Sequence, residues 1–499
     1  MEALAETRSG TVKGRNDDGI LSFRGIPFAV APVGDMRWQP PARETPFDTT
    51  FDADSFGPIG IQGHMALEAM MGGTPPNKSE DCLTLNVWTS DTEGSRPVLV
   101  WIHGGGFMFG SGSTPWYDGS RFVASGDVVV VTINYRLGPF GFLYLGELFD
   151  GMEHSGNLGI LDQVAALQWV RDSIAGFGGD PDNITIFGES AGAGSIATLL
   201  GTPSARGLFH KAILQSGAAS WGLDRSEATN NARKVLAQLG IEPGDKAALL
   251  STSSDAVLTA SEILGGEVSG GKLPFAPVHD GVVLPEPPLV AIANGSSANV
   301  HVICGTNTDE MTLFSLMDPT LATLDDHGMS KRVTTFDSNI DGDELVRTYR
   351  DSRGGASAAD VWIAMSTDAV FRIPAIRLVE AHLKHGPAWM YLFTWASPAF
   401  GGALKSTHAL EIPFVFDNLD QPGVAVFTGD GPERQGIADG MHAAWLAFAN
   451  NHDPAHAGIP EWPTYDLDRR QTMKIDANWE LLHDPMGDER KFWEHETAL

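Results

Sequence analysis

The chain has 499 residues, of which 42% are hydrophobic and 19% charged, and this balance is typical of a globular protein with a large core. Its formal net charge of −30 argues against nucleic acid and anionic membranes as partners. No apolar run approaches the roughly 18 residues of a membrane span, and residues 1–6 are acidic where a signal peptide is basic. We therefore expect a soluble, cytoplasmic protein, with its two cysteines, Cys82 and Cys304, as buried thiols.

The first third of the chain reads as strands separated by glycine turns. Residues 7–28 predict a small antiparallel edge, and the Pro-, Gly- and Met-rich residues 31–80 predict an irregular excursion. Further strands are expected at residues 80–88, 97–102 and 127–133. The last two are continuous apolar runs, which belong to parallel sheets covered on both faces.

The central part alternates between helix and strand. Residues 159–175 have helical spacing, 184–187 form a short apolar strand, and a small-residue helix starts near Ala191. The next strand is expected at residues 211–215, and residues 226–265 read as helices. This alternation predicts βαβ units, and so an α/β fold with a large, mostly parallel central sheet and helices on both faces.

The remainder continues this pattern around one helical block. Residues 311–385 are dominated by helical periodicity and predict a cap or insert within a single domain of residues 1–499. The other elements expected here are strands at 300–304, 389–393 and 473–475, an apolar helix at 441–449, and a short charged helix at the end.

The strand at 184–187 leads into a G-x-S-x-G pattern made by Gly188, Ser190 and Gly192. A serine at such a strand-to-helix turn has its hydroxyl raised on a strained elbow, within reach of a base. An incidental serine in an ordinary turn would give the same pattern. Whether Ser190 is a nucleophile therefore depends on whether the rest of the chain supplies the other groups that a nucleophile needs.

A second motif follows the strand at 97–102. The run from His103 through Gly104, Gly105 and Gly106 to Phe107 exposes backbone N–H groups at the carboxyl end of a strand, where α/β sheets bind ligands. In a serine hydrolase this run forms half of an oxyanion hole, which the N–H after the nucleophile, here Ala191, completes.

A serine nucleophile needs a base and a residue that orients it. Asp309 and Glu310 follow the strand at 300–304 and could supply the acid. His408 lies after the strand at 389–393 and completes the order Ser, acid, His of serine hydrolases with this turn. His442 is the rival, but we expect it to head an apolar helix and to have a structural role.

Together these stretches resemble the type-B carboxylesterases, the family of bacterial para-nitrobenzyl esterases, liver carboxylesterases and cholinesterases. The resemblance rests on eight stretches spread over almost the whole chain, at residues 23–29, 80–86, 100–107, 134–138, 157–163, 187–192, 215–217 and 408–414.

The resemblance implies an α/β-hydrolase fold and a serine carboxylesterase that needs no cofactor. It implies Ser190 as the nucleophile, Glu310 rather than Asp309 as the acid, and His408 as the base. The oxyanion donors it implies are the N–H groups of Gly105, Gly106 and Ala191, and Ser216 resembles a serine that supports the triad from behind.

Two departures from the family pattern bear on location and substrate. Gly60 stands where relatives from oxidising compartments have a cysteine that pairs with the one matching Cys82, so the early disulfide is absent. The cholinesterase tryptophan is also absent, because residues 60–79 contain no aromatic residue. Candidates for the pocket wall, each of which could equally be ordinary core, are Phe107, Trp221, Phe314, Met65, Met70 and Met71.

Several alternatives stay open beside a small neutral ester with a short to medium acyl chain as the substrate. The same triad would serve an amidase, a carbamate hydrolase or a lipase, and inactive adhesion proteins share the family's fold. Residues 337–343 copy half of a calcium loop but Thr348 replaces its last ligand, and residues 192–197 copy a dinucleotide motif that close helix packing explains better. We expect no metal, no nucleic acid and no membrane partner, and either a monomer or a homodimer.

Overall fold

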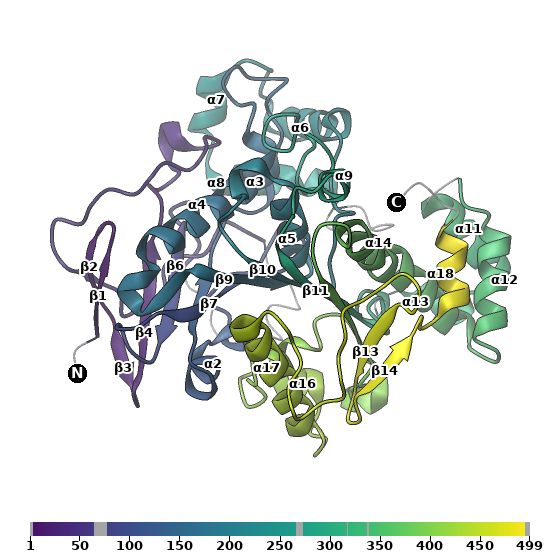
Figure 1. Ribbon diagram of the computed structural model, residues 1–499. Coiled ribbons are helices and arrows are strands. Elements are labelled where there is room, and N and C mark those ends of the chain that lie inside the picture. Colours follow the sequence, from purple (N-terminus) through teal and green to yellow (C-terminus); the bar gives the residue numbers. More distant parts are fainter. Residues whose placement is uncertain (1–2, 64–76, 266–272, 317, 337–338, 495–499) are drawn as a thin grey trace.

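The computed structural model describes residues 3–63, 77–265, 273–316, 318–336 and 339–494. An 11-stranded sheet crosses the molecule with its strands in the order β14-β13-β12-β11-β10-β9-β7-β8-β6-β4-β3 (Figure 1). The strands of this sheet are β3 (Arg15–Asp17), β4 (Ile20–Pro27), β6 (Thr84–Thr89), β7 (Arg96–Ile102), β8 (Val129–Ile133), β9 (Gly179–Glu189), β10 (Lys211–Gln215), β11 (His301–Asn307), β12 (Ala388–Phe393), β13 (Gln471–Ile475) and β14 (Glu480–His483).

The seven strands from β8 to β13 pair in parallel, and antiparallel strands extend the sheet at both edges. A second, three-stranded sheet is formed by β1 (Leu4–Thr7), β2 (Gly10–Lys13) and β5 (Phe51–Asp52). The large, mostly parallel sheet expected from the sequence is confirmed.

Alternate residues of each central strand face two different cores. In β7, Val98, Val100 and Ile102 pack into one hydrophobic cluster, while Leu99 and Trp101 pack into the other. Because both faces are covered, these strands are apolar throughout, as the sequence indicated.

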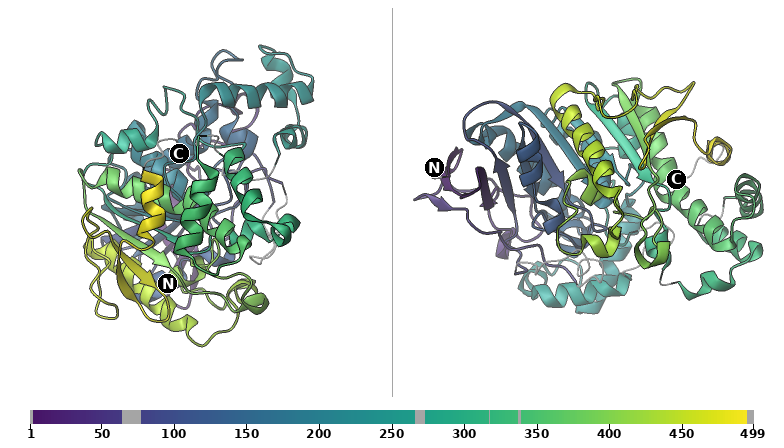
Figure 2. Two further views of the ribbon diagram at one scale, coloured as in Figure 1. Left: turned by 90° about the vertical axis from the view of Figure 1, so that its right-hand side faces the viewer. Right: turned by 90° about the horizontal axis from the view of Figure 1, so that it is seen from below.

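Helices cover both faces of the sheet (Figures 1 and 2). The helices on one face include α4 and α5 against β9 and α14 against β11 and β12, whereas α2 and α17 lie on the other face. The helices are α2 (Ser120–Ser125), α3 (Gly138–Phe142), α4 (Leu158–Ser173), α5 (Ala191–Gly201), α6 (Arg225–Leu239), α7 (Lys246–Ser251), α8 (Ser254–Ser261), α9 (Pro288–Ala293), α10 (Thr312–Ser315), α11 (Asp326–Phe336), α12 (Gly342–Ser352), α13 (Ala358–Thr367), α14 (Ile373–His382), α15 (Ile412–Val415), α16 (Val424–Thr428), α17 (Arg434–Asn451) and α18 (Gly487–Glu494).

Two expectations about the elements were wrong in detail, and one strand was not expected at all. The strand expected at 80–88 begins only at Thr84, because tight turns hold residues 80–84, with the Cys82 N–H bonded to Glu80 O and the Thr84 N–H to Cys82 O. Helix α17 begins at Arg434, two turns before the expected 441, so His442 lies within the helix and does not head it. Strand β14 was not expected, since its half-exposed residues show no apolar pattern.

Residues 311–385 contain α10 to α14, and α13 and α14 form one long helix interrupted by a π turn at Asp368–Arg372. Helices α11 and α12 project beside the sheet, next to the C-terminal helix α18 (Figures 1 and 2). No helix among the described residues is long and apolar enough to cross a membrane.

Candidate active site

Ser190 occupies a sharp turn between β9, which ends at Glu189, and α5, which begins at Ala191. Its backbone is in a strained conformation, with φ 54° and ψ −124°. A Cβ atom on Gly188 or Gly192 would lie only 2.5 Å or 2.0 Å from the carbonyl oxygen of Ile102 in β7. The glycines around Ser190 are therefore required because strand, turn and helix nearly touch the neighbouring strand.

The glycine run after β7 lies directly against this turn. A Cβ on Gly104 would be 3.1 Å from the Cβ of Ser190, and a Cβ on Gly105 would collide with Phe109 O at 2.1 Å. Both Gly105, with φ 110°, and Gly106, with φ 60°, adopt backbone conformations that favour glycine.

Within the part of the chain that the structure describes, the N–H groups of Gly105 and Gly106 have no recorded hydrogen-bond acceptor. The Ala191 N–H is the first of helix α5, and such groups have no partner inside their helix. Three backbone donors from two elements are therefore available beside Ser190 for an oxygen that carries negative charge.

His408 and Glu310 form a closely paired, buried couple. The Nδ1 of His408 lies 2.7 Å from Oε2 of Glu310, and the other carboxylate oxygen, Oε1, accepts the backbone N–H of Asn307 at 2.7 Å. Glu310 is fully buried and His408 is 4% exposed. A carboxylate at Nδ1 holds the proton on that nitrogen and leaves Nε2 to act on a substrate.

The Nε2 of His408 faces the end of β9, where Glu189 Oε1 lies 3.0 Å from it. The imidazole is thus held between two buried carboxylates, one of which immediately precedes Ser190. Asp309, the other acid candidate, contributes its N–H to Ser406 O, and no contact of it with His408 is recorded among the described residues.

These contacts shift the pKa values of both partners. Burial raises the pKa of Glu189 well above its ordinary value, and the nearby His408 only partly offsets this. Burial alone would lower the pKa of His408, but the charge of Glu189 and the hydrogen bond to Glu310 raise it to about 9. A negative charge on Glu189 stabilises the imidazolium, so the imidazole is more basic when Glu189 is charged than when it is neutral. Burial favours the neutral, protonated form of Glu189.

A buried polar network supports the couple from behind. The Nδ2 of Asn307 donates to Glu411 Oε2 at 2.7 Å, Gln215 Nε2 donates to Glu411 Oε1 at 3.1 Å, and Trp445 Nε1 donates to Gln215 Oε1 at 3.1 Å. Ser216 follows Gln215 with φ 52°, and its hydroxyl is buried without a partner among the described residues.

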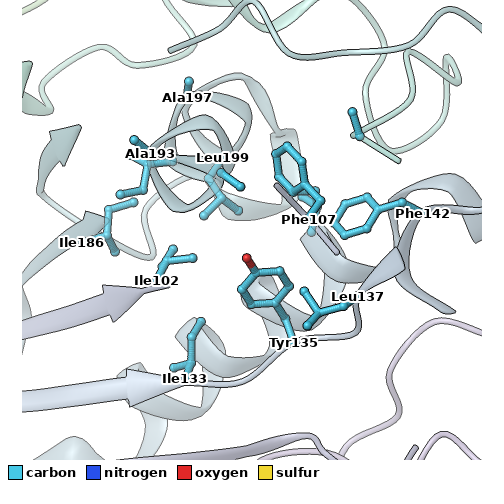
Figure 3. Packing of buried hydrophobic residues seen from close by; sticks show 14 of the residues in the cluster. Ile102, Phe107, Ile133, Tyr135, Leu137, Phe142, Ile186, Ala193, Ala197 and Leu199 are labelled. Atoms are coloured by element: carbon cyan, nitrogen blue, oxygen red, sulfur yellow. The ribbon is translucent and has the colours of Figure 1, made fainter. Parts of the chain in front are cut away.

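Two aromatic rings lie against the imidazole, and a third packs against one of them. The ring of Phe314 lies 5.2 Å from that of His408, the ring of Phe371 lies 4.9 Å from it, and Trp221 packs edge-on against Phe371 at 5.7 Å. Of the expected wall residues, Trp221 and Phe314 are therefore beside the site. Phe107 is fully buried and packs at 5.1 Å against Phe142 in the core cluster (Figure 3), while Met65, Met70 and Met71 lie outside the described residues.

The other candidates have structural roles. His442 contacts Ser125 Oγ at 2.6 Å through Nε2 and Val415 O at 2.9 Å through Nδ1. Asp341, from the incomplete calcium loop, caps helix α12 by accepting the N–H groups of Asp343 and Glu344. Within the described ranges no group of three or more histidine, cysteine, aspartate or glutamate side chains could hold a metal ion.

Comparisons with known proteins agree with this geometry. Residues 2–493 match the model of the carboxylesterase family, and the chain belongs to that family. It is a carboxylic ester hydrolase with the α/β-hydrolase fold.

Its relatives are similar over nearly their whole length. The chain is 38% identical to the para-nitrobenzyl esterase of Bacillus subtilis (strain 168), covering 98% of both chains, and 36% identical to the phenmedipham hydrolase of Pseudarthrobacter oxydans, covering 96% of this chain and 97% of that one. The crystal structure of a Geobacillus stearothermophilus carboxylesterase at pH 6.2 superposes with a TM-score of 0.90 at 43% identity, covering 98% of this chain and all of that chain.

Two residues at the site were missed by the reading of the sequence. Glu189 is one of the two variable residues of the G-x-S-x-G motif, and nothing in its spacing indicates that it would reach His408. Phe371 lies in a stretch read simply as helix; the signal that could have drawn attention to it is Pro374, which interrupts a helical pattern.

Proposed function

We propose that Ser190, His408 and Glu310 form a catalytic triad that hydrolyses neutral carboxylic esters through an acyl-enzyme. The observation that carries this proposal is the placement of one imidazole between Glu310, at 2.7 Å from Nδ1, and the end of the strand that bears Ser190. That arrangement supplies a base whose tautomer is fixed and whose other nitrogen, Nε2, faces the end of the strand that precedes the nucleophile.

In the first step, His408 takes the proton of Ser190 as its oxygen attacks the ester carbonyl. The negative charge that develops on the carbonyl oxygen is stabilised by the N–H groups of Gly105, Gly106 and Ala191. His408 then gives the proton to the departing alcohol, and the acyl group stays on Ser190. Water repeats the sequence and releases the acid, while Glu310 stabilises the imidazolium at each stage.

The surroundings of the imidazole favour an apolar substrate without charge. Phe314, Phe371 and Trp221 present apolar surface there, and buried carboxylates already occupy the site, so an anionic ester would be repelled. We propose neutral esters with short to medium acyl chains as the substrate class. Names of relatives favour ester hydrolysis over an amidase or a lipase.

The decisive experiment compares Ser190→Ala with Ser195→Ala. Ser195 is a buried serine on α5, the helix that follows Ser190, and its hydroxyl accepts from Gln163 Nε2 at 3.0 Å, so it is a control for loss of a nearby serine hydroxyl. We expect Ser190→Ala to lose hydrolysis of p-nitrophenyl esters and labelling by an organophosphate while keeping its circular dichroism spectrum. Near-normal hydrolysis by folded Ser190→Ala would refute the proposal.

We also propose a cytoplasmic location. The chain has only two cysteines, and both Cys82 and Cys304 are buried free thiols, as is typical of proteins from reducing compartments. Fractionation of the source cells, followed by activity and mass spectrometry, tests this; recovery outside the cytoplasmic fraction would contradict it.

A further inference from the structure

The π turn at Asp368–Arg372 interrupts the helix formed by α13 and α14. The Ile373 N–H donates to the carbonyl of Asp368, five residues back, in place of the usual four. The next residue, Pro374, has no N–H, and in a regular helix its ring would clash with the carbonyl of Val370. Widening the helix by one residue relieves this conflict, and such π turns occur frequently at functional sites.

The π turn contacts aromatic residues of the site on one side and a buried polar cluster on the other. On one side, Phe371 is 2% exposed and packs against His408, Trp221 and Phe314, with ring-to-ring distances of 4.9, 5.7 and 6.4 Å. It is the aromatic residue that links the base of the triad to the rest of the wall.

On the other side, a buried polar cluster ties the same turn to the C-terminal helix α18. Arg372 binds Asp368 through two bonds of 2.6 Å, and Asp368 also accepts the hydroxyl of Tyr349 on α12. The Tyr349 oxygen in turn accepts the indole N–H of Trp493 on α18 at 2.9 Å. All four side chains are buried, so their positions are tightly coupled.

The geometry points to Phe371 as a residue that determines substrate size, and we propose that the cluster of Asp368, Arg372, Tyr349 and Trp493 positions it. The ring fills space next to the imidazole that an apolar chain of the ester would otherwise occupy. The turn cannot move on one side without disturbing the bonds on the other, so α18 takes part in setting the size limit. This inference rests on the proposed ester hydrolysis and adds the residue that limits the apolar chain.

The first test replaces Phe371 by Leu and by Ala and measures kcat/KM on two series of esters. One series lengthens the acyl chain of p-nitrophenyl esters from acetate to decanoate, and the other lengthens the alcohol of acetate esters. We expect the ratio of long-chain to acetate kcat/KM to rise about tenfold or more in one series, the usual effect of a few methylene groups in an apolar pocket. The series that responds identifies which part of the ester lies beside His408.

The control is Phe448→Leu, because Phe448 is fully buried but packs against Trp389 on the opposite face of the sheet. It tests whether any loss of a buried phenyl ring changes the profile. Phe371→Leu provides the result if Phe371→Ala does not fold. Unchanged ratios in both series for a folded Phe371 variant would overturn the proposal.

The second test addresses the positioning cluster. Tyr349→Phe removes the hydroxyl that bonds both Asp368 and Trp493, and Trp493→Phe removes the indole N–H, while an aromatic side chain remains at each position. In each variant we expect the ratio of long-chain to acetate kcat/KM to shift in the same direction as in Phe371→Leu, with a change in KM for long chains. The double variant Tyr349→Phe/Phe371→Leu should show a shift in this ratio no larger than that of Phe371→Leu alone. The matched control is Trp462→Phe, which loses an indole bond to Met390 O of 3.2 Å on the other face. A profile equal to that of wild type, or fully additive shifts, would show that the cluster is merely structural.

These outcomes are separable from failure of the proposed function. If Ser190→Ala remains active, the triad is wrong. If Ser190→Ala is inactive but the Phe371 variants keep the wild-type ratios, only the size-determining role is wrong.

Discussion

The carboxylate of Glu189 lies 3.0 Å from Nε2 of His408, the same nitrogen that must receive the proton of Ser190 in the proposed mechanism. Glu189 is buried, and its pKa is raised well above the ordinary value, first of all by burial. The state of this carboxyl group therefore controls how readily the imidazole accepts and releases a proton.

The pH profile should respond to Glu189. His408 is active as a base only when neutral, so activity is lost as pH falls through its pKa, which the charge of Glu189 and the hydrogen bond to Glu310 raise to about 9 against the effect of burial. Glu189→Gln removes the charge of Glu189 at nearly constant shape. We expect the acid limb of kcat/KM to move to lower pH in this variant.

Glu411→Gln is the comparison, because Glu411 raises the pKa of His408 less than Glu189 or Glu310 does. Its acid limb should shift in the same direction by a smaller amount. An acid limb that stays in place or moves to higher pH in Glu189→Gln would contradict the role given to Glu189.

Loss of the Glu310 charge should remove most of the turnover. Glu310→Gln presents either an amide oxygen or an amide N–H to His408 Nδ1, 2.7 Å away, and so neither fixes the tautomer nor stabilises the imidazolium as a carboxylate does. The equivalent Asp-to-Asn change in a serine protease lowers kcat about 10⁴-fold, and we expect a fall of about 10³- to 10⁴-fold here. Steady-state kinetics measures it; a loss below tenfold would show that another group orients the base.

Gly105 and Gly106 of the proposed oxyanion hole should differ sharply in their tolerance of alanine. In Gly105→Ala, the new Cβ would lie 2.1 Å from Phe109 O, so the loop must move. We expect kcat to fall by about 10²- to 10³-fold, as when one oxyanion donor is lost. In Gly106→Ala the nearest atom is 3.7 Å away, and only the left-handed φ of 60° is unfavourable, so the loss should be smaller. Equal losses in both variants would contradict this account.

The buried pair of Arg136 and Asp162 should be important for stability. Asp162 accepts both the backbone N–H and the side chain of Arg136, at 2.6 to 3.0 Å, and the two side chains are only 4% and 0% exposed. Asp162→Asn leaves a buried guanidinium without its counter-charge, which costs about 3–5 kcal/mol. Urea unfolding should show a clearly lower midpoint. Asp488→Asn, which loses an exposed partner of Lys491, should leave the midpoint unchanged.

The positions of the central strands along the chain and the residues of the candidate site could be predicted because they depend on local patterns. Apolar runs such as residues 129–133 predict buried parallel strands, and motifs at strand ends place Ser190, the glycine run and Glu310 at the carboxyl edge of the sheet. What could not be predicted depends on contacts between distant residues. Glu189 reaches His408 over more than 200 positions, and the direction of Phe371 follows from one extra residue in a helical turn.

The strained backbone of Ser190 has a consequence for how this enzyme can be improved. Its φ of 54° is a conformation that glycine adopts freely but serine does not, and a residue held in such a region costs about 1–3 kcal/mol. Ser190→Gly should therefore raise the melting temperature while it abolishes hydrolysis. Thermal stability and catalytic turnover thus make opposite demands on Ser190. A selection for heat resistance alone would favour glycine at this position, although that change removes the hydroxyl needed for hydrolysis.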